Sequence, residues 1–333
     1  MWKVTNRDNN IYLEKFEEKI IQPIFDIILE VSKKRKRKLT SSSFWKNTIV
    51  YKSLSVKDKS LIDYIMQVIV NKESFSKVTL QIINNYSYAQ LEAVYIVYLS
   101  QNALIKFKFY GLIKEIVPHE IKTLFVDFYY NRFFNDKVIW NILMNSDYSR
   151  TIFHENFKKE NMLSVCPYCD IDTFVSNSNK NVEHFYPKSK FPLVCMNAYN
   201  LISSCIACNK AHEGKGDTSP KSPVVTPYSE EINEKIKFEI NFSERKISFV
   251  NLGDITYENY FDLLKLNTRY QSEVVFDSLD IKAETLFNIC TIAGKVNPDV
   301  LKNYLREKSK DENLMVALNH LIKEYPRYKA MSP

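Results

Sequence analysis

The stretch CPYCDIDTFVSNSNKNVEHFYPKSKFPLVCMNAYNLISSCIACN, residues 166–209, is framed by two CxxC pairs. The first pair is Cys166 and Cys169, and the second is Cys205 and Cys208. A CxxC turn directs two thiolates at one ion, and two such turns make the closed tetrahedral set typical of structural zinc. The sequence therefore predicts a Zn²⁺ site with four cysteine ligands. Two buried reduced pairs, or redox-active pairs, are the alternative that the spacing leaves open.

Inside and just after this frame lie VEHFYPKS, NLISSCIACN and GKGD. Together with CPYC, this pattern resembles the HNH endonucleases of the ββα-metal fold in their zinc-stapled form. The resemblance is specific over residues 160–230. It continues more weakly through 223–229, a predicted hairpin and 265–270, where it is similar to HNH nucleases of bacterial anti-phage systems such as the Septu type. The first ~155 residues carry no such likeness.

The resemblance implies a role for each matching residue. His184 matches the general base, because a neutral imidazole can take a proton from water near neutral pH. Glu183 and Asn209 match the ligands of a catalytic Mg²⁺, with Mn²⁺ as an alternative. Asn200 matches the residue that holds the histidine loop through backbone hydrogen bonds. His212, about one helical turn beyond Asn209, is an alternative metal ligand.

Adjacent residues in a regular strand point to opposite faces. Glu183 and His184 can therefore serve one site only where the strand ends or bends between them. Their pairing is implied by the resemblance and not by periodicity.

Four lysines near the motif are candidates for contacts to nucleic-acid phosphates, which position a strand without reading its bases. They are Lys188, Lys190, Lys210 and Lys215. The net charge of +7 favours an anionic partner but does not require one. The basic run 33–38 is either a further phosphate contact or a solvated helix end.

The remaining sequence predicts a mainly α-helical protein with the ββα-metal core embedded in it. Only five glycines occur, which suits helices. Apolar spacing predicts helices over 10–31, 57–71, 88–115 and 120–146, and again from about 256. Alternation over 236–240 and 246–250 predicts a β-hairpin. We expect a helical N-terminal region (1–158) for partner docking, a nuclease core (159–230), and a hairpin with C-terminal helices (231–333).

The N-terminus lacks the apolar core of a signal peptide, and the chain has no apolar run of membrane-spanning length, so we expect a cytoplasmic protein. The leading hypothesis is a metal-dependent HNH endonuclease that cuts DNA in bacterial defence, with an ATPase as a partner suggested by analogy. Two alternatives are a zinc-stabilised nucleic-acid-binding or scaffold subunit without catalysis and an RNA-cutting HNH toxin.

Overall fold

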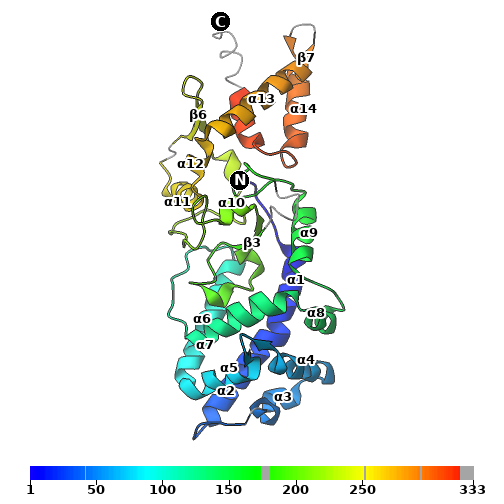
Figure 1. Cartoon of the computed structure of the whole chain (residues 1–333), viewed down its shortest axis with the longest axis vertical. Helices are drawn as coiled ribbons and strands as arrows, with labels where there is room; N and C mark the ends of the chain where they lie inside the picture. The colour runs from blue at the N-terminus through cyan, green and yellow to red at the C-terminus, as the bar shows by residue number, and fades with distance from the viewer. Residues whose placement is uncertain (42, 174–180, 251–252, 293–294, 323–333) are drawn as a thin grey trace. The chain divides into compact units, whose positions relative to one another are not determined.

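The computed structural model describes residues 1–41, 43–173, 181–250, 253–292 and 295–322. The protein is mainly helical, and its described strands form four two-stranded sheets (Figure 1). None of the helices in the described ranges is long and apolar enough to cross a membrane.

The chain forms two compact units, and each is built from separate segments. The unit that we call the cysteine unit comprises residues 1–5, 158–183 and 202–333. The helical unit comprises residues 6–157 and 184–201. Strands β3 and β4 form one of the two-stranded sheets, and the boundary between the units passes through both strands. The division of the chain into regions 1–158, 159–230 and 231–333 stays a prediction.

The helical unit holds most of the helices, several of which begin at a Ser, Thr or Asp that caps the first turn. Its elements are α1 (Arg7–Phe16), η1 (Glu17–Ile21), α2 (Gln22–Lys34), η2 (Phe44–Asn47), α3 (Ile49–Ser53), α4 (Val56–Gln67), β1 (Ile69–Val70), β2 (Glu73–Ser74), α5 (Phe75–Asn85), α6 (Tyr88–Lys106), α7 (His119–Thr123), η3 (Leu124–Arg132), η4 (Phe133–Asn135), α8 (Lys137–Met144), most of α9 (Arg150–Asn161), η6 (Pro192–Val194) and η7 (Ala198–Asn200).

The cysteine unit mixes short strands with helices. Its elements, counting the two shared strands, are β3 (Asn181–His184), β4 (Leu201–Ser204), α10 (Ile206–Asn209), η8 (Ile232–Glu234), β5 (Phe238–Asn241), β6 (Lys246–Phe249), α11 (Ile255–Leu264), α12 (Leu266–Tyr270), α13 (Glu273–Cys290), β7 (Thr291–Ile292), β8 (Lys295–Val296) and α14 (Pro298–Lys308).

Helix α6 shows where helical periodicity misleads. We predicted a helix over 88–115, but α6 ends at Lys106 and Lys108 has a left-handed backbone, with φ of 62°. Tyr110 is buried, and its hydroxyl donates to the carbonyl of Tyr199 at 2.8 Å. A long-range contact therefore ends the helix, which local propensity does not foresee.

Of two other predicted elements, one is shorter in the structure and one is confirmed. The helix predicted over 57–71 stops at Gln67, because positive φ at Asn71 and Lys72 closes a small β1–β2 hairpin. The hairpin predicted over 236–250 is confirmed: β5 and β6 pair antiparallel, with Phe238 opposite Phe249. The alternating pattern was informative there because these two strands pair only with each other.

Aromatic side chains fill the core of the helical unit. The ring of Phe16 lies 5.5 Å from that of Trp140 and 5.7 Å from that of Tyr129, measured between centroids. Phe75 packs edge-on against Phe128 at 5.2 Å. All five side chains are 1% exposed or less, so the aromatic content of the chain is used mainly for packing in this unit.

Candidate functional site

The four predicted zinc ligands lie together in the cysteine unit. Cys166, Cys169, Cys205 and Cys208 are fully buried, and their sulfur atoms lie within 4.8 Å of one another. The Cys166–Cys208 and Cys169–Cys205 sulfur distances are both 3.8 Å. A tetrahedral site with Zn–S bonds of about 2.3 Å requires sulfur atoms about 3.8 Å apart, whereas a disulfide requires about 2 Å. The cluster therefore fits a zinc ion and excludes two disulfides in this arrangement.

The thiol pKa values of the cluster shift in different directions. Burial opposes ionisation of Cys169, yet hydrogen bonds from the other cysteines and the charge of Arg269 hold its thiol pKa well below the usual value. Hydrogen bonding to Cys166 and the other cysteines raises the pKa of Cys205, and burial raises that of Cys208. A divalent ion bound to all four sulfur atoms would hold them as thiolates.

Arg269 contacts the cysteine cluster, which the sequence did not indicate. Its guanidinium lies 3.0 Å from the Cys208 sulfur and 3.6 Å from that of Cys169, and it forms an ion pair of 2.7 Å with Asp172. The segment KLNTRY, in which it lies, is a weak part of the resemblance. Neither its spacing nor its residue type indicated contact with residues so distant in sequence.

Glu183 is held by a buried ion pair in the cysteine unit. It lies in β3, is 5% exposed, and its Oε1 atom is 2.8 Å from the Nζ atom of Lys215. The side chain of Lys215 is 0% exposed. We predicted that Lys215 contacts phosphate. In this structure its ammonium is buried and pairs with Glu183, and the phosphate contact stays a prediction. The sequence around Lys215 does not indicate that this lysine is buried and paired with Glu183.

A tight turn brings Lys215 back to the end of α10. The amide of Gly214 donates to the carbonyl of Lys210 at 2.7 Å, and the amide of Lys215 donates to the carbonyl of Cys208 at 2.8 Å. A Cβ atom on Gly214 would lie only 2.3 Å from that Cys208 carbonyl oxygen, so the turn requires glycine. Through this turn Lys215 links Glu183 to the backbone beside Asn209.

His184 is buried in the helical unit. It is 4% exposed, and its ring lies 4.3 Å from that of Tyr130, edge to face. Its Nε2 atom lies 3.1 Å from the carbonyl oxygen of Cys195. Because a carbonyl only accepts, Nε2 carries the proton of this hydrogen bond. His184 thus has a defined orientation.

Asn200 fastens the loop that follows His184. Its side-chain amide donates to the carbonyls of Tyr186 and Val194, at 3.1 and 3.2 Å, and its side-chain oxygen accepts from the amide of Tyr186 at 2.8 Å. The Asn200 carbonyl accepts from the amide of Phe185 at 2.8 Å. These are hydrogen bonds of the kind that its predicted role requires.

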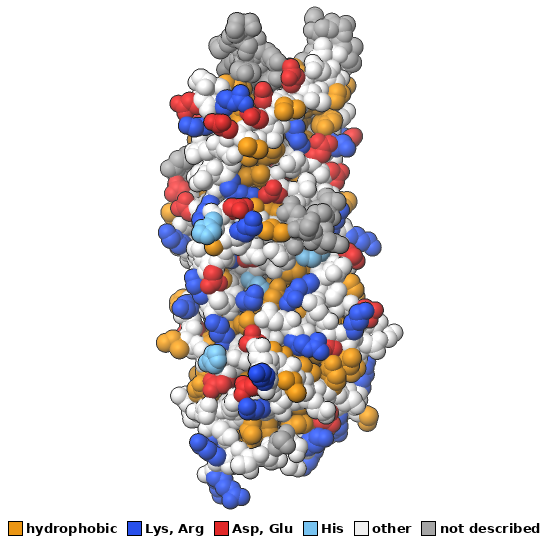
Figure 2. Space-filling model, viewed as in Figure 1, with side chains coloured by type: hydrophobic (Ala, Val, Ile, Leu, Met, Phe, Trp, Pro, Cys, Tyr) orange, Lys and Arg blue, Asp and Glu red, His pale blue; other side chains and the backbone are white. Residues whose placement is uncertain are grey.

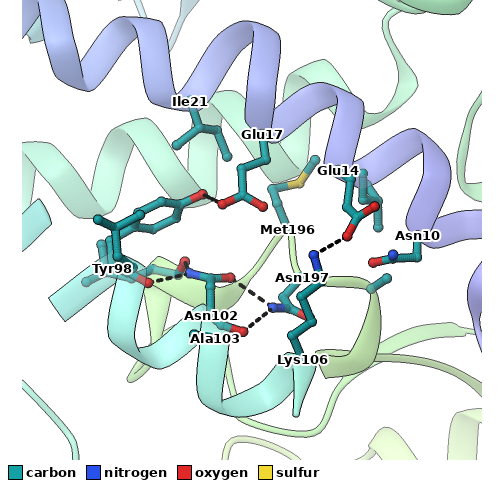
Figure 3. Close-up of a pocket in the computed structure, with 14 residues that line it drawn as sticks. Asn10, Glu14, Glu17, Ile21, Tyr98, Asn102, Ala103, Lys106, Met196 and Asn197 are labelled. Carbon is teal, nitrogen blue, oxygen red and sulfur yellow. Dashed lines mark hydrogen bonds and ion pairs between the residues drawn. The ribbon is translucent and has the colours of Figure 1, made fainter. Parts of the chain in front are cut away.

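Helix α6 supports the same loop from the other side. Asn102 donates to the carbonyl of Leu193 at 3.0 Å, and Asn197 donates to the side-chain oxygen of Asn102 at 3.0 Å. Figure 3 shows this pair at the edge of a cavity of about 220 Å³, into which Glu17 also reaches. The N-terminal helices thereby position the segment whose Cys195 carbonyl holds His184.

The other predicted site residues have more open surroundings. Asn209 is the last residue of α10 and is half-buried, whereas the side chain of His212 is exposed. Lys210 is exposed and pairs with Glu213 at 3.2 Å. Lys188 lies over the Tyr130 ring, 5.0 Å from its centroid. The structure thus brings Lys188, Tyr130 and His184 together.

Glu183 and His184 are consecutive in β3 but engage different partners. Glu183 contacts Lys215, whereas His184 contacts Tyr130 and the Cys195 carbonyl. That the two serve one site therefore stays a prediction.

The comparisons with known proteins give one relevant similarity. The chain is 30% identical over 100 residues to a protein named Septu protein PtuB from Bacillus thuringiensis. The match covers 30% of this chain and 38% of the relative, so the chain spans well under half of that protein. No family model and no solved structure matches the chain.

Proposed function

We propose that this protein is a metal-dependent HNH endonuclease that hydrolyses phosphodiester bonds, with DNA as the favoured substrate. The observation that carries the proposal is the setting of His184: a buried, oriented imidazole directly after a buried carboxylate, between two CxxC pairs. The order β3, β4, α10 along the chain is that of a ββα-metal core. Similarity to a Septu protein supports a role in anti-phage defence, with another subunit of such a system as partner.

In the proposed reaction, the His184 imidazole takes a proton from water. The Cys195 carbonyl orients the ring through its hydrogen bond with Nε2. Asn200 and the Asn102–Asn197 pair keep that carbonyl in place. Glu183 and Asn209 would hold Mg²⁺, which supplies stabilisation of charge on the phosphate and the leaving oxygen. Lys215 positions the Glu183 carboxylate through their ion pair.

The test is plasmid cleavage by the purified chain, with and without added Mg²⁺, beside the variant His184→Ala. We expect cleavage only with Mg²⁺ and a loss of about 10²–10⁴-fold in the variant, the usual contribution of a general base. His154→Ala is the matched control, because His154 is a buried histidine of the same unit with no assigned chemistry. Thermal melting and zinc content are measured for each protein, so that unfolding of either unit is not mistaken for loss of catalysis.

Glu183 is tested by Glu183→Gln, which keeps the volume of the side chain. Glu183→Ala would leave the buried Lys215 charge unpaired and cost about 3–5 kcal/mol in stability, which would obscure the result. We expect Glu183→Gln to retain zinc and lose cleavage. If the wild type cuts neither DNA nor RNA, alone or with proteins that co-purify from its native source, the nuclease proposal is wrong.

One observation favours a second candidate. The Lys215 ammonium already contacts Glu183 as a cation, so a divalent ion at Glu183 would have to share or displace that contact. A zinc-stabilised nucleic-acid-binding subunit without catalysis needs no ion there. That protein would bind nucleic acid in the wild type and in His184→Ala alike and would cut it in neither.

A further inference from the structure

A cavity of about 470 Å³ in the helical unit gathers basic side chains. It lies between the chain that follows α6 and the turn that follows β3. Lys114 and Lys122 line it from the first segment and Lys190 from the second, with Ser189 beside Lys190. Among the described residues that line it, Glu115 is the only acidic one, so the charge of the cavity is positive. Two of these lysines, Lys114 and Lys122, come from the N-terminal region and were not among the lysines that the sequence indicated as phosphate contacts.

The charges of the three lysines are not neutralised within the described part of the chain. No carboxylate in the described ranges forms an ion pair with Lys114, Lys122 or Lys190. In the basic run at 33–38, Lys34 pairs with Glu30 and Arg35 donates to backbone carbonyls, whereas Lys36, Arg37 and Lys38 are exposed. On the face drawn in Figure 2, basic and acidic side chains are interspersed.

The turn after β3 connects this cavity to His184. The amides of Lys190 and Phe191 both donate to the carbonyl of Pro187, at 3.0 and 2.8 Å, which closes the turn. Within it, Lys188 lies over the Tyr130 ring that contacts His184, while Lys190 lines the cavity. This turn therefore carries two lysines: Lys188, beside Tyr130 and His184, and Lys190, in the basic cavity.

We propose that this cavity binds a backbone phosphate of a nucleic-acid strand, with Lys114, Lys122 and Lys190 as its cationic contacts. Lysine ammonium groups act as point charges toward phosphate and carry no base readout. The described lining includes no Asn, Gln, Arg or aromatic side chain that could recognise a base edge or stack on a base. Binding here is therefore independent of nucleotide sequence. The inference rests on the proposed function for one part only, namely that the bound strand continues to His184.

The experiment compares two triple variants that remove the same charge. Lys114→Ala/Lys122→Ala/Lys190→Ala empties the cavity of its cations, and Lys36→Ala/Arg37→Ala/Lys38→Ala removes three exposed cations from the basic run. Binding of labelled duplex DNA, single-stranded DNA and RNA is measured by fluorescence anisotropy at several salt concentrations. No divalent ion or chelator is added, so cleavage is suppressed and zinc is retained. Thermal melting and zinc content confirm that both variants are folded.

We expect the cavity variant to bind about tenfold or more weakly at low salt. Its salt slope of log K should fall by about one for each phosphate that the protein no longer neutralises. The weakening should be the same for unrelated DNA sequences, and the basic-run variant should stay close to the wild type. A weakening confined to RNA would identify RNA as the bound strand. Unchanged binding, an equal weakening in the basic-run variant, or a wild type that binds neither DNA nor RNA would overturn the inference.

Binding and cleavage separate this inference from the proposed function. If the cavity variant binds weakly while the wild type binds but never cuts, the phosphate site stands and the nuclease proposal fails. If the wild type cuts and the cavity variant cuts equally well at limiting DNA, the nuclease stands and the phosphate site fails.

Discussion

The helical unit and the cysteine unit hold their interiors together by different means. Around Phe16, Phe75 and Trp140, the helical unit buries rings that pack against one another at 5–6 Å. In the cysteine unit, tyrosines surround four thiols, and the Tyr260 and Tyr270 hydroxyls donate to carbonyls of the first CxxC turn, each at 2.8 Å. Apolar packing needs no ion, whereas four buried thiols need one.

This difference indicates which of the two units should depend on a metal ion for its stability. If zinc organises the cysteine unit, its loss should leave the helical unit folded. If the aromatic core organises the helical unit, damage there should leave zinc bound. The variants described next test whether the two units are stabilised independently of each other.

The largest effect is expected from Cys208→Ser. Metal binding to a structural four-ligand site contributes on the order of 10 kcal/mol to folding. We expect this variant to lose zinc and amide protection around residues 158–173 and 202–215, while amides of the helical unit stay protected. Hydrogen exchange with mass spectrometry and zinc quantification check this.

Cys290→Ser is the matched control for Cys208→Ser, because Cys290 is a buried cysteine outside the cluster. It should keep zinc. Wild-type protein should also release zinc as the pH falls, because thiolate ligands become protonated. Collapse of both units together in Cys208→Ser would show that they fold as one.

A smaller effect is expected from Trp140→Ala in the helical unit. Trp140 is fully buried, and its indole nitrogen donates to the carbonyl of Phe134 at 2.9 Å. Truncating such a residue costs about 3–5 kcal/mol in the free energy of unfolding. Chemical denaturation followed by circular dichroism measures the loss. Zinc stoichiometry in the folded variant should equal that of the wild type, and release of zinc before unfolding would contradict the separation.

The smallest effect is expected from Asn200→Ala, at the edge of the helical unit. The substitution leaves a backbone amide and two carbonyls of the histidine loop without their hydrogen-bond partner. Leaving a buried polar group unsatisfied costs about 1–3 kcal/mol in the free energy of unfolding. Amides over 185–196 should exchange faster with little change elsewhere. Asn197→Ala, which removes the bond to Asn102, is the milder comparison. Equal exchange in wild type and Asn200→Ala would exclude the loop-holding role.

Much of the organisation was predictable from the residues. The CxxC spacing predicted the cluster because the ligands of each pair lie within one turn. The β5–β6 hairpin followed from alternation over a short distance. The ends of α4 and α6 were missed because contacts from other segments decide them, as the Tyr110–Tyr199 bond does for α6. Helices α5 and α9 were not predicted, although the buried residues Phe75, Val78 and Ile82 of α5 recur at helical spacing.

The residue types and their local spacing specify the available chemistry: four thiols in two turns, a carboxylate beside a histidine between those turns, and lysines downstream. The fold, in contrast, buries Lys215 against Glu183, brings Arg269 to the thiols, and places Lys190 in a cavity with lysines from the N-terminal region. A charged side chain is exposed or paired according to what the rest of the chain brings beside it, and that cannot be read along one stretch of sequence.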